Sequence, residues 1–267
     1  MDATTLTSPK TVDSRHGLRF TTWSPRSAAL VAGAGLAVMA VLGGFANFGA
    51  IALIVPGDAT LTAQNISAAP LLFWAGVVSF AIVALLDILV AGALYVLLKP
   101  VNRRVSAAAG WLRTVYALLL LVAVSQLVTG FSLLDDPAAA LPVLESFSTI
   151  WVISLGLFGA SLLLVGYLAF RSGFMARFFG VLLVIAGVGY LADAIGMAAL
   201  PGFTVVFAQF LFVGEVVIIF WLLIKGRRLP SSCPDRQRRS RAPRSGQPSR
   251  SLPSALRRRK DGRIQDE

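Results

Sequence analysis

Six runs of mostly apolar residues, each long enough to cross a bilayer, dominate the sequence. A hydrocarbon core of about 30 Å requires about 20 apolar residues in a helix that rises about 1.5 Å per residue. Each run is expected to be a helix, because an open strand would leave backbone amides unpaired in lipid. The predicted spans cover residues 27–55, 70–98, 105–134, 146–170, 178–200 and 203–224. The sequence therefore predicts an all-α polytopic membrane bundle with six transmembrane helices.

The composition favours the same class of protein. Of the 267 residues 56% are hydrophobic and only 14% are charged, which is too little polar material to cover a soluble globule. The lipid bilayer is thus the expected surrounding. The chain contains one cysteine and one histidine, so neither a disulfide framework nor a His/Cys metal site is expected within one chain. We predict no cofactor and no bound metal.

The connections between the runs alternate in charge, which predicts their orientation. Lys and Arg occur before the first run, after the second, after the fourth and after the sixth. The connections at residues 56–69, 135–145 and 201–202 have none, and instead contain Asp58, Asp135, Asp136 and Glu145. Because positive charges near span ends stay on the cytoplasmic side, both termini are predicted to be cytoplasmic. Asp58 is also a candidate cap for a short helix on the outer surface.

Three regions follow from these patterns: a cytoplasmic N-terminal segment at 1–26, a six-helix transmembrane domain at 27–225, and a basic cytoplasmic tail at 226–267. The tail is rich in Arg, Ser and Pro, so it cannot form a core and is expected to be disordered. Its charge is expected to attract anionic lipids. Nucleic-acid binding is the less favoured interpretation, because the tail lacks aromatic residues on which bases could stack.

Four ionisable residues interrupt the apolar runs: Asp87, Arg113, Asp193 and Glu215. Inserting a charged side chain near the bilayer centre costs roughly 2.5 to 3.5 kcal/mol of free energy. These four residues are therefore expected either to pair with other polar groups or to have a function. Counting the helical rise from the flanking basic residues puts Asp87, Arg113 and Glu215 near one level. The second connection is short, so its two helices are expected to be antiparallel neighbours. We predict that Arg113 pairs with Asp87, with Tyr116 nearby as a hydrogen-bond donor and Glu215 as a second carboxylate.

This predicted cluster has three interpretations. In the favoured one, the charges fix the register of the helices and bind nothing. In the second, the cluster is an ion, proton or substrate site, because one of two carboxylates beside a single guanidinium would hold a proton. In the third, the groups are unrelated and face water or headgroups. Nearer the outer side, Asp193 and Tyr190 form a candidate pocket with Asn47 or Gln126. The favoured interpretation of Asp193 is that it bonds a neighbouring helix or reaches the outer headgroups.

Several short motifs combine polar residues with apolar surroundings. They include IVPGD at residues 54–58, LLKPVNR at 97–103 and GVGYLAD at 187–193. In these motifs the chain resembles the bacterial membrane family catalogued as domain of unknown function 4386, over about residues 27–225. The resemblance implies a multi-span bundle in a bacterial plasma membrane and brings no known activity.

No motif in the sequence specifies a reaction. There is no phosphate-binding loop, no histidine pair and no Gly-x-Ser-x-Gly elbow. The sequence favours a non-enzymatic role, either binding or passage of a small or lipidic molecule or a structural or regulatory function. The alternative is an intramembrane enzyme that uses Asp87, Glu215 or Asp193 as an acid or base.

Overall fold

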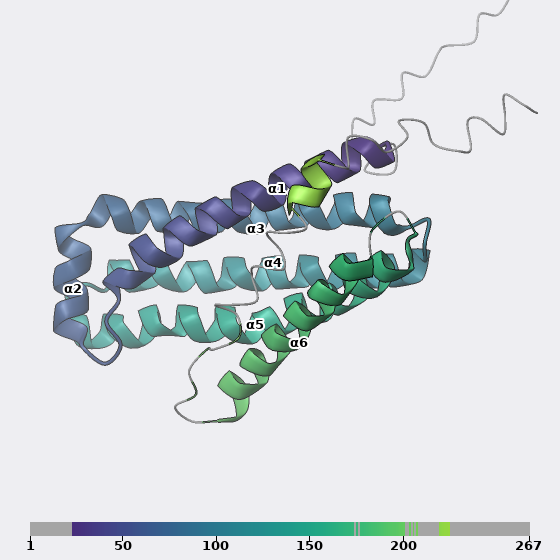
Figure 1. The fold of residues 1–267 in the computed structure, drawn as a ribbon. Helices are drawn as coiled ribbons and strands as arrows, with labels where there is room; N and C mark the ends of the chain where they lie inside the picture. Colours follow the sequence, from purple (N-terminus) through teal and green to yellow (C-terminus); the bar gives the residue numbers. More distant parts are fainter. Residues whose placement is uncertain are drawn as a thin grey trace, which may run out of the picture. The chain divides into compact units, whose positions relative to one another are not determined.

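The computed structural model describes residues 23–173, 175, 177–200, 203, 205, 207 and 219–224. This part of the chain contains helices and turns and no strand. The helices are α1 (Pro25–Phe45), α2 (Ala59–Ala68), α3 (Pro70–Leu98), α4 (Arg103–Ser132), α5 (Pro137–Arg171) and α6 (Arg177–Ala199), shown in Figure 1. A π-helical turn, η2 (Ala46–Ala50), and a 3-10 turn, η3 (Ile51–Leu53), continue α1. Residues 219–224 are also helical.

Five of these segments are long and apolar enough to cross a membrane: α1 with its continuation to Leu53, α3, α4, α5 and α6. The observed bounds of α3 are those predicted. For three other segments the observed ends lie within two residues of the predicted ends: α1 with its continuation, α4 and α6. These findings confirm the helical class and are consistent with a membrane protein. The sixth predicted span, 203–224, lies largely outside the described residues.

The start of α5 differs from the prediction. Residues 135–145 were expected to connect two spans, but α5 begins at Pro137. The Asp136 side chain accepts a hydrogen bond from the backbone N–H of Ala139 at 3.3 Å, which caps the helix. Pro137 occupies the first turn, where its missing N–H has no helical partner to lose. Glu145 therefore lies within a helix and not in a loop.

The helices form a series in which each packs on the next. The order across the bundle is α1, α3, α4, α5 and α6. In Figure 1, α3, α4 and α5 run side by side, α1 crosses α3 at a slant, and α6 diverges from α5. Asn102 makes the tight connection between α3 and α4, because its side chain accepts hydrogen bonds from the N–H groups of Arg104 and Val105. Neighbouring helices are consequently antiparallel where the connections are short.

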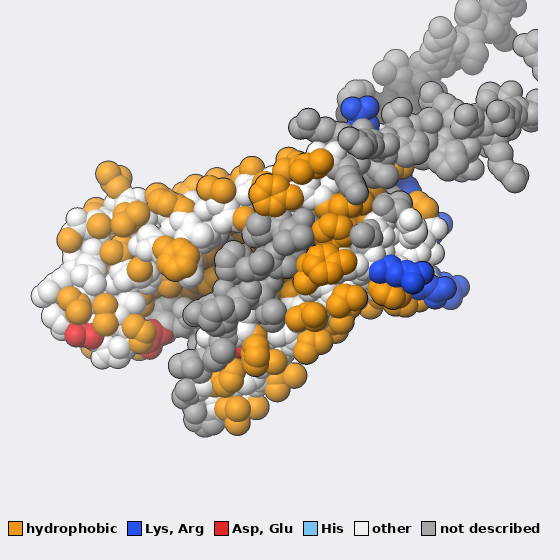
Figure 2. Space-filling view, in the orientation of Figure 1, with side chains coloured by type: hydrophobic (Ala, Val, Ile, Leu, Met, Phe, Trp, Pro, Cys, Tyr) orange, Lys and Arg blue, Asp and Glu red, His pale blue; other side chains and the backbone are white. Residues whose placement is uncertain are grey.

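Large apolar side chains cover the outside of the helices as well as the interior. Phe48, Leu71 and Trp111 are 82%, 85% and 70% exposed, and Figure 2 shows apolar groups along the visible face. A soluble monomer rarely exposes continuous apolar surface of this extent. The surface is suited to contact with lipid chains.

Helices α5 and α6 approach each other through two pairs of glycines. A Cβ atom built at Gly159 would lie 2.7 Å from the carbonyl oxygen of Gly187, and one at Gly187 would lie 2.7 Å from that of Gly159. Gly166 and Gly180 have the same reciprocal relation, at 2.8 and 2.7 Å. The pairs are seven residues apart on each helix, so they share one face. The backbones touch there, which is the close approach that small residues permit between membrane helices.

Helix α2 crosses the bundle at one end (Figure 1) and is capped as predicted. The Asp58 side chain accepts a hydrogen bond from the N–H of Leu61 at 2.9 Å. The Thr62 hydroxyl donates to the carbonyl oxygen of Val55 and accepts from the Val55 N–H. These bonds fix the first turn of α2 against the segment that precedes it.

Two further hydrogen bonds fasten α2 and its entry turn to their neighbours. The N–H of Gly57 donates to the carboxylate of Glu145 in α5 at 2.9 Å. Gly57 has a φ of 77°, a left-handed conformation that other residues rarely adopt. The Asn65 amide donates to the carbonyl oxygen of Leu53 at 3.3 Å. The α2 end of the bundle is thus joined to both η3 and α5.

Candidate functional site

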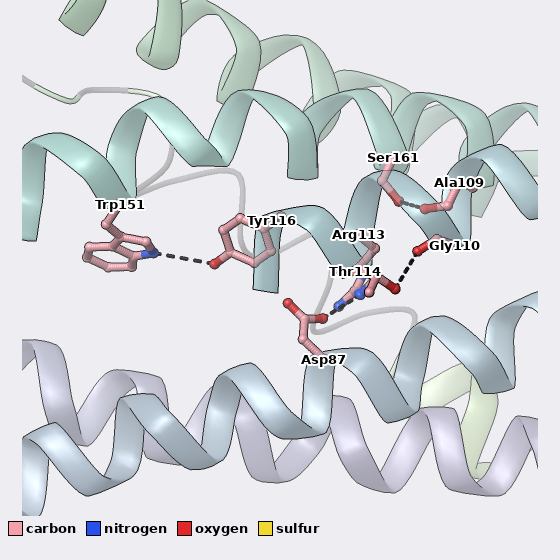
Figure 3. Close-up of polar contacts among 8 residues, drawn as sticks. All are labelled: Asp87, Ala109, Gly110, Arg113, Thr114, Tyr116, Trp151 and Ser161. Atoms are coloured by element: carbon pink, nitrogen blue, oxygen red, sulfur yellow. Dashed lines mark hydrogen bonds and ion pairs between the residues drawn. The ribbon is translucent and has the colours of Figure 1, made fainter. Parts of the chain in front are cut away.

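The structure brings together Asp87 of α3 and Arg113 of α4. The Arg113 Nε–H donates to Asp87 Oδ1 to form an ion pair between the two helices (Figure 3). Asp87 is completely buried and Arg113 is 2% exposed. The two residues meet because α3 and α4 are antiparallel and each residue lies a similar number of turns from the short connection.

The ion pair leaves one polar atom of each partner unused. Among the described residues, the buried atoms Asp87 Oδ2 and Arg113 Nη2 have no hydrogen-bond partner. A buried polar group without a partner costs roughly 1 to 3 kcal/mol, and more when it is charged. An acceptor and a donor therefore remain available at the pair.

A small pocket adjoins Arg113 between α3, α4 and α5. Its wall extends from Arg113 past Gly110 and Val165 to Leu98 and Ser106, next to the connection between α3 and α4. The space that a water molecule can occupy is about 10 Å³, close to the minimum for a single water. The small space beside Arg113 therefore lies on the side of the ion pair that faces the end of the bundle opposite α2.

Hydroxyl groups near the pair bond to backbone carbonyls. Ser161 of α5 donates to the carbonyl oxygen of Ala109, and Thr114 donates to that of Gly110, both at 2.9 Å (Figure 3). The Ser161 bond joins α5 to α4 beside the pocket. With their protons committed to carbonyls, neither hydroxyl is arranged as a partner for the Asp87 carboxylate.

Aromatic residues of α5 contact the guanidinium of Arg113 and the side chain of Tyr116. The Cζ atom of Arg113 lies 4.7 Å from the ring centroid of Phe158, a cation–π contact. Tyr116, predicted as a donor near Asp87, accepts a hydrogen bond from Trp151 Nε1 at 3.3 Å (Figure 3). Its ring also packs against Phe158. Sequence reasoning missed Trp151 and Phe158. Their spacing of seven residues, which puts them on one face of a helix, was the available signal.

The predicted outer pocket is only partly brought together. Asp193 and Tyr190 are buried in α6, and Asp193 accepts a hydrogen bond from the N–H of Phe207 at 3.2 Å. The ring of Tyr190 packs edge-on against Phe158 at 5.4 Å, which links it to the Arg113 cluster. Asn47 lies in η2, which packs on α1 and α3, whereas α6 packs on α5 among the described elements. A ligand pocket at these residues stays a prediction.

Two other predictions lie outside the described residues: Glu215 as the second carboxylate and the basic tail. Within the described residues, no group of three His, Cys, Asp or Glu side chains could hold a metal ion. The site is thus built from one ion pair, its aromatic neighbours and a small pocket.

Comparison with known proteins places the chain in a family. The family model described as "Domain of unknown function (DUF4386)" matches residues 31–226. The chain belongs to the DUF4386 family. An uncharacterised protein from Archaeoglobus fulgidus is 34% identical over 153 residues, which are 57% of this chain and 85% of that protein. No solved structure matches the chain. The predicted family is confirmed, and its description assigns no activity to the DUF4386 domain.

The geometry defines what the DUF4386 site can bind. A partner must supply a donor for Asp87 Oδ2, an acceptor for Arg113 Nη2, or both. Water, a hydroxyl group, an amide or a carboxylic acid satisfies this requirement. The surrounding rings of Tyr116 and Phe158 favour a partner whose remaining surface is apolar.

Proposed function

We propose that this DUF4386 protein is a non-enzymatic, multi-pass protein of the plasma membrane that binds a small or lipidic molecule through the Asp87–Arg113 pair. The observation that carries the proposal is the buried acceptor and donor left over at this pair. A pair that served only to join two helices would gain stability from having both atoms satisfied. A ligand with a polar head supplies the missing hydrogen bonds.

The size of the pocket limits how the ligand enters. The space beside Arg113 is large enough for about one water. The polar head would occupy this space, and its apolar remainder requires α5 to move slightly away from α3 and α4. Leu98 and Ser106 line the pocket near the α3–α4 connection, so we infer entry from this end.

The charges of the bundle support the proposed orientation. Figure 2 shows Lys and Arg side chains at the end opposite α2 and Asp and Glu side chains at the α2 end. Positive charge marks the cytoplasmic side of a membrane protein. The proposal therefore includes a cytoplasmic basic end, a sixth span over residues 203–224, cytoplasmic termini and adhesion of the tail to anionic lipid. The ligand then reaches Arg113 from the cytoplasmic side.

The experiment compares the wild type with the double variant Asp87→Leu/Arg113→Met. Both proteins are purified in mild detergent, and small molecules that copurify are detected by native mass spectrometry. Because the double variant removes both charges and keeps apolar volume, it should fold but lose the bound species seen on the wild type. The control is Gln126→Leu, which removes another polar contact between α4 and α5, Ser146 Oγ to Gln126 Oε1, and should retain the ligand. Identical bound species on all three proteins would refute the proposal.

The intramembrane enzyme is supported less well by the same site. An acid or base needs a second group that acts on the substrate beside it. The nearest described hydroxyls, Ser161 and Thr114, donate to backbone carbonyls. The site therefore offers hydrogen bonds for binding without a second group positioned for catalysis.

A further inference from the structure

The turn between α5 and α6 carries two arginines whose charge is not neutralised by the described part of the chain. Arg171 ends α5 and Arg177 begins α6, and both are exposed. Among the described residues, neither forms an ion pair with a carboxylate, in contrast to the buried Arg113. The two positive charges are thus available to an external anion.

Aromatic rings hold both guanidinium groups. The Nη1 of Arg171 donates to the hydroxyl oxygen of Tyr167 at 2.9 Å, and its Cζ lies 5.8 Å from the Tyr167 ring centroid. The Cζ of Arg177 lies 5.5 Å from the ring centroid of Phe170. Holding a side chain in place before binding reduces the entropy that binding costs. The side chains of Arg171 and Arg177 are therefore preorganised for binding, and they lose less conformational entropy than freely moving surface charges would.

The same two arginines line one hollow. Among the described residues, its wall includes Phe170, Arg171, Gly173, Met175 and Arg177, and its volume is about 550 Å³. The turn that forms it is fixed by the Ser172 hydroxyl, which accepts from the Met175 N–H at 3.2 Å. Gly173 adopts a φ of 70°, which reverses the chain. The hollow thus combines two guanidinium groups with the apolar side chains of Phe170 and Met175.

We propose that this hollow binds the phosphodiester head of an anionic phospholipid. Guanidinium groups match phosphate oxygens with paired hydrogen bonds. We favour a lipid over free phosphate because Tyr167, Phe170 and Phe178 beside the turn are 42%, 45% and 62% exposed and can contact acyl chains. The inference rests on the proposed membrane placement and is independent of any ligand at Arg113.

The test separates a defined site from general positive charge. Full-length protein is embedded in nanodiscs of mixed phosphatidylglycerol and phosphatidylcholine. The protein is then released from the nanodiscs, and the lipid that it retains is measured by native mass spectrometry. The variant Arg171→Lys/Arg177→Lys keeps the charge that orients the protein but loses the planar donors. We expect it to retain about tenfold less phosphatidylglycerol than the wild type. The matched control Arg103→Lys/Arg104→Lys, at two exposed arginines in the first turn of α4, should retain as much as the wild type.

Three outcomes would overturn the inference. The first is equal retention by the Arg171→Lys/Arg177→Lys variant and the wild type. The second is equal loss in both double variants, which would indicate diffuse charge. The third is displacement of the lipid by inorganic phosphate, which would indicate a free-anion site. Should the Arg171→Lys/Arg177→Lys variant fail to fold, Tyr167→Phe replaces it, because it removes the hydrogen bond to Arg171 and is expected to lower retention about twofold. Unchanged retention in Tyr167→Phe would then count against the site.

Loss of lipid at this turn and loss of ligand at Arg113 are distinguishable. The Asp87→Leu/Arg113→Met variant should retain phosphatidylglycerol while it loses the species bound in the bundle. Phosphatidylglycerol retention in a protein that binds nothing at Arg113 would support the hollow and refute the proposed function alone.

Discussion

Two helix interfaces of this bundle hold their helices together in different ways. Between α5 and α6, glycines such as Gly159 and Gly187 bring backbone against backbone. Between α3 and α4, the Asp87–Arg113 ion pair joins the helices and a small pocket lies beside it. Inside a membrane, lipid chains are as apolar as the helices, so close packing and hydrogen bonds must drive their association. The first interface leaves no room for a ligand, whereas the second retains both space and polar atoms.

The largest expected effect is at the α3–α4 interface. Arg113→Met leaves the buried carboxylate of Asp87 without its partner, which should lower the free energy of unfolding by about 3 to 5 kcal/mol. Thermal unfolding in detergent, followed by size-exclusion chromatography, measures the loss. The matched control is Asp87→Leu/Arg113→Met, in which no charge is left and most of the stability should return. If the Arg113→Met variant is as stable as the wild type, the ion pair does not hold α3 to α4.

The next effect tests the α5–α6 interface. Gly187→Val puts a branched side chain where even a Cβ atom would lie 2.7 Å from the Gly159 carbonyl oxygen. Such overpacking should cost about 1 to 3 kcal/mol, measured by the same unfolding assay. Gly43→Val is the control, because a Cβ at Gly43 in α1 meets no atom within 4 Å. If both variants lose equal stability, helix propensity and not backbone contact explains the result.

The smallest effect distinguishes the two interfaces directly. At Gly110, beside the ion pair, an added Cβ would lie 3.7 Å from the carbonyl oxygen of Ala91, an ordinary contact. Gly110→Ala should therefore stabilise the protein by roughly 0.5 to 1 kcal/mol through the better helix propensity of alanine. Gly187→Ala, compared in the same unfolding assay, should instead destabilise it. A loss of stability in both would show that the α3–α4 interface is packed as tightly as α5–α6.

Local rules in the sequence were sufficient to predict several parts of this structure. The bounds of α3 follow from its apolar length and from Pro70 at its start. The cap by Asp58 follows from its residue type before a short helix. The Asp87–Arg113 contact follows from depth and from a short connection, since two antiparallel neighbours bring residues at equal depth together. In each case the deciding information lies within a few residues or one connection.

The remaining features depend on information that is not local. Asp136 and Pro137 are typical of a helix start, but acidic residues and proline are also typical of an outer connection between two spans. The sequence alone therefore did not show that the helix begins at Pro137. The contacts of Phe158 with Arg113 and of Trp151 with Tyr116 depend on the rotation of α5, which the sequence near these residues does not specify. The direct contact of Gly159 with Gly187 depends in the same way on how two whole helices meet. Whether Asn47 and Asp193 share a pocket depends in the same way on which helices are neighbours, and depth in the membrane does not determine that.

The fastening of α2 has a mechanical consequence. Gly57 is bonded to Glu145 of α5, and Asn65 to the backbone of Leu53, at the same end of the bundle. At the other end the short connection at residues 99–102 joins α3 to α4, so α5 can tilt against the α3–α4 pair more easily than α3 and α4 can move apart. Displacement of α5 relative to α3 and α4 then increases with distance from α2 and is greatest near Arg171. A small change in the tilt of α5 would widen the cavity beside Arg113 from that end only, while the α2 end remained shut.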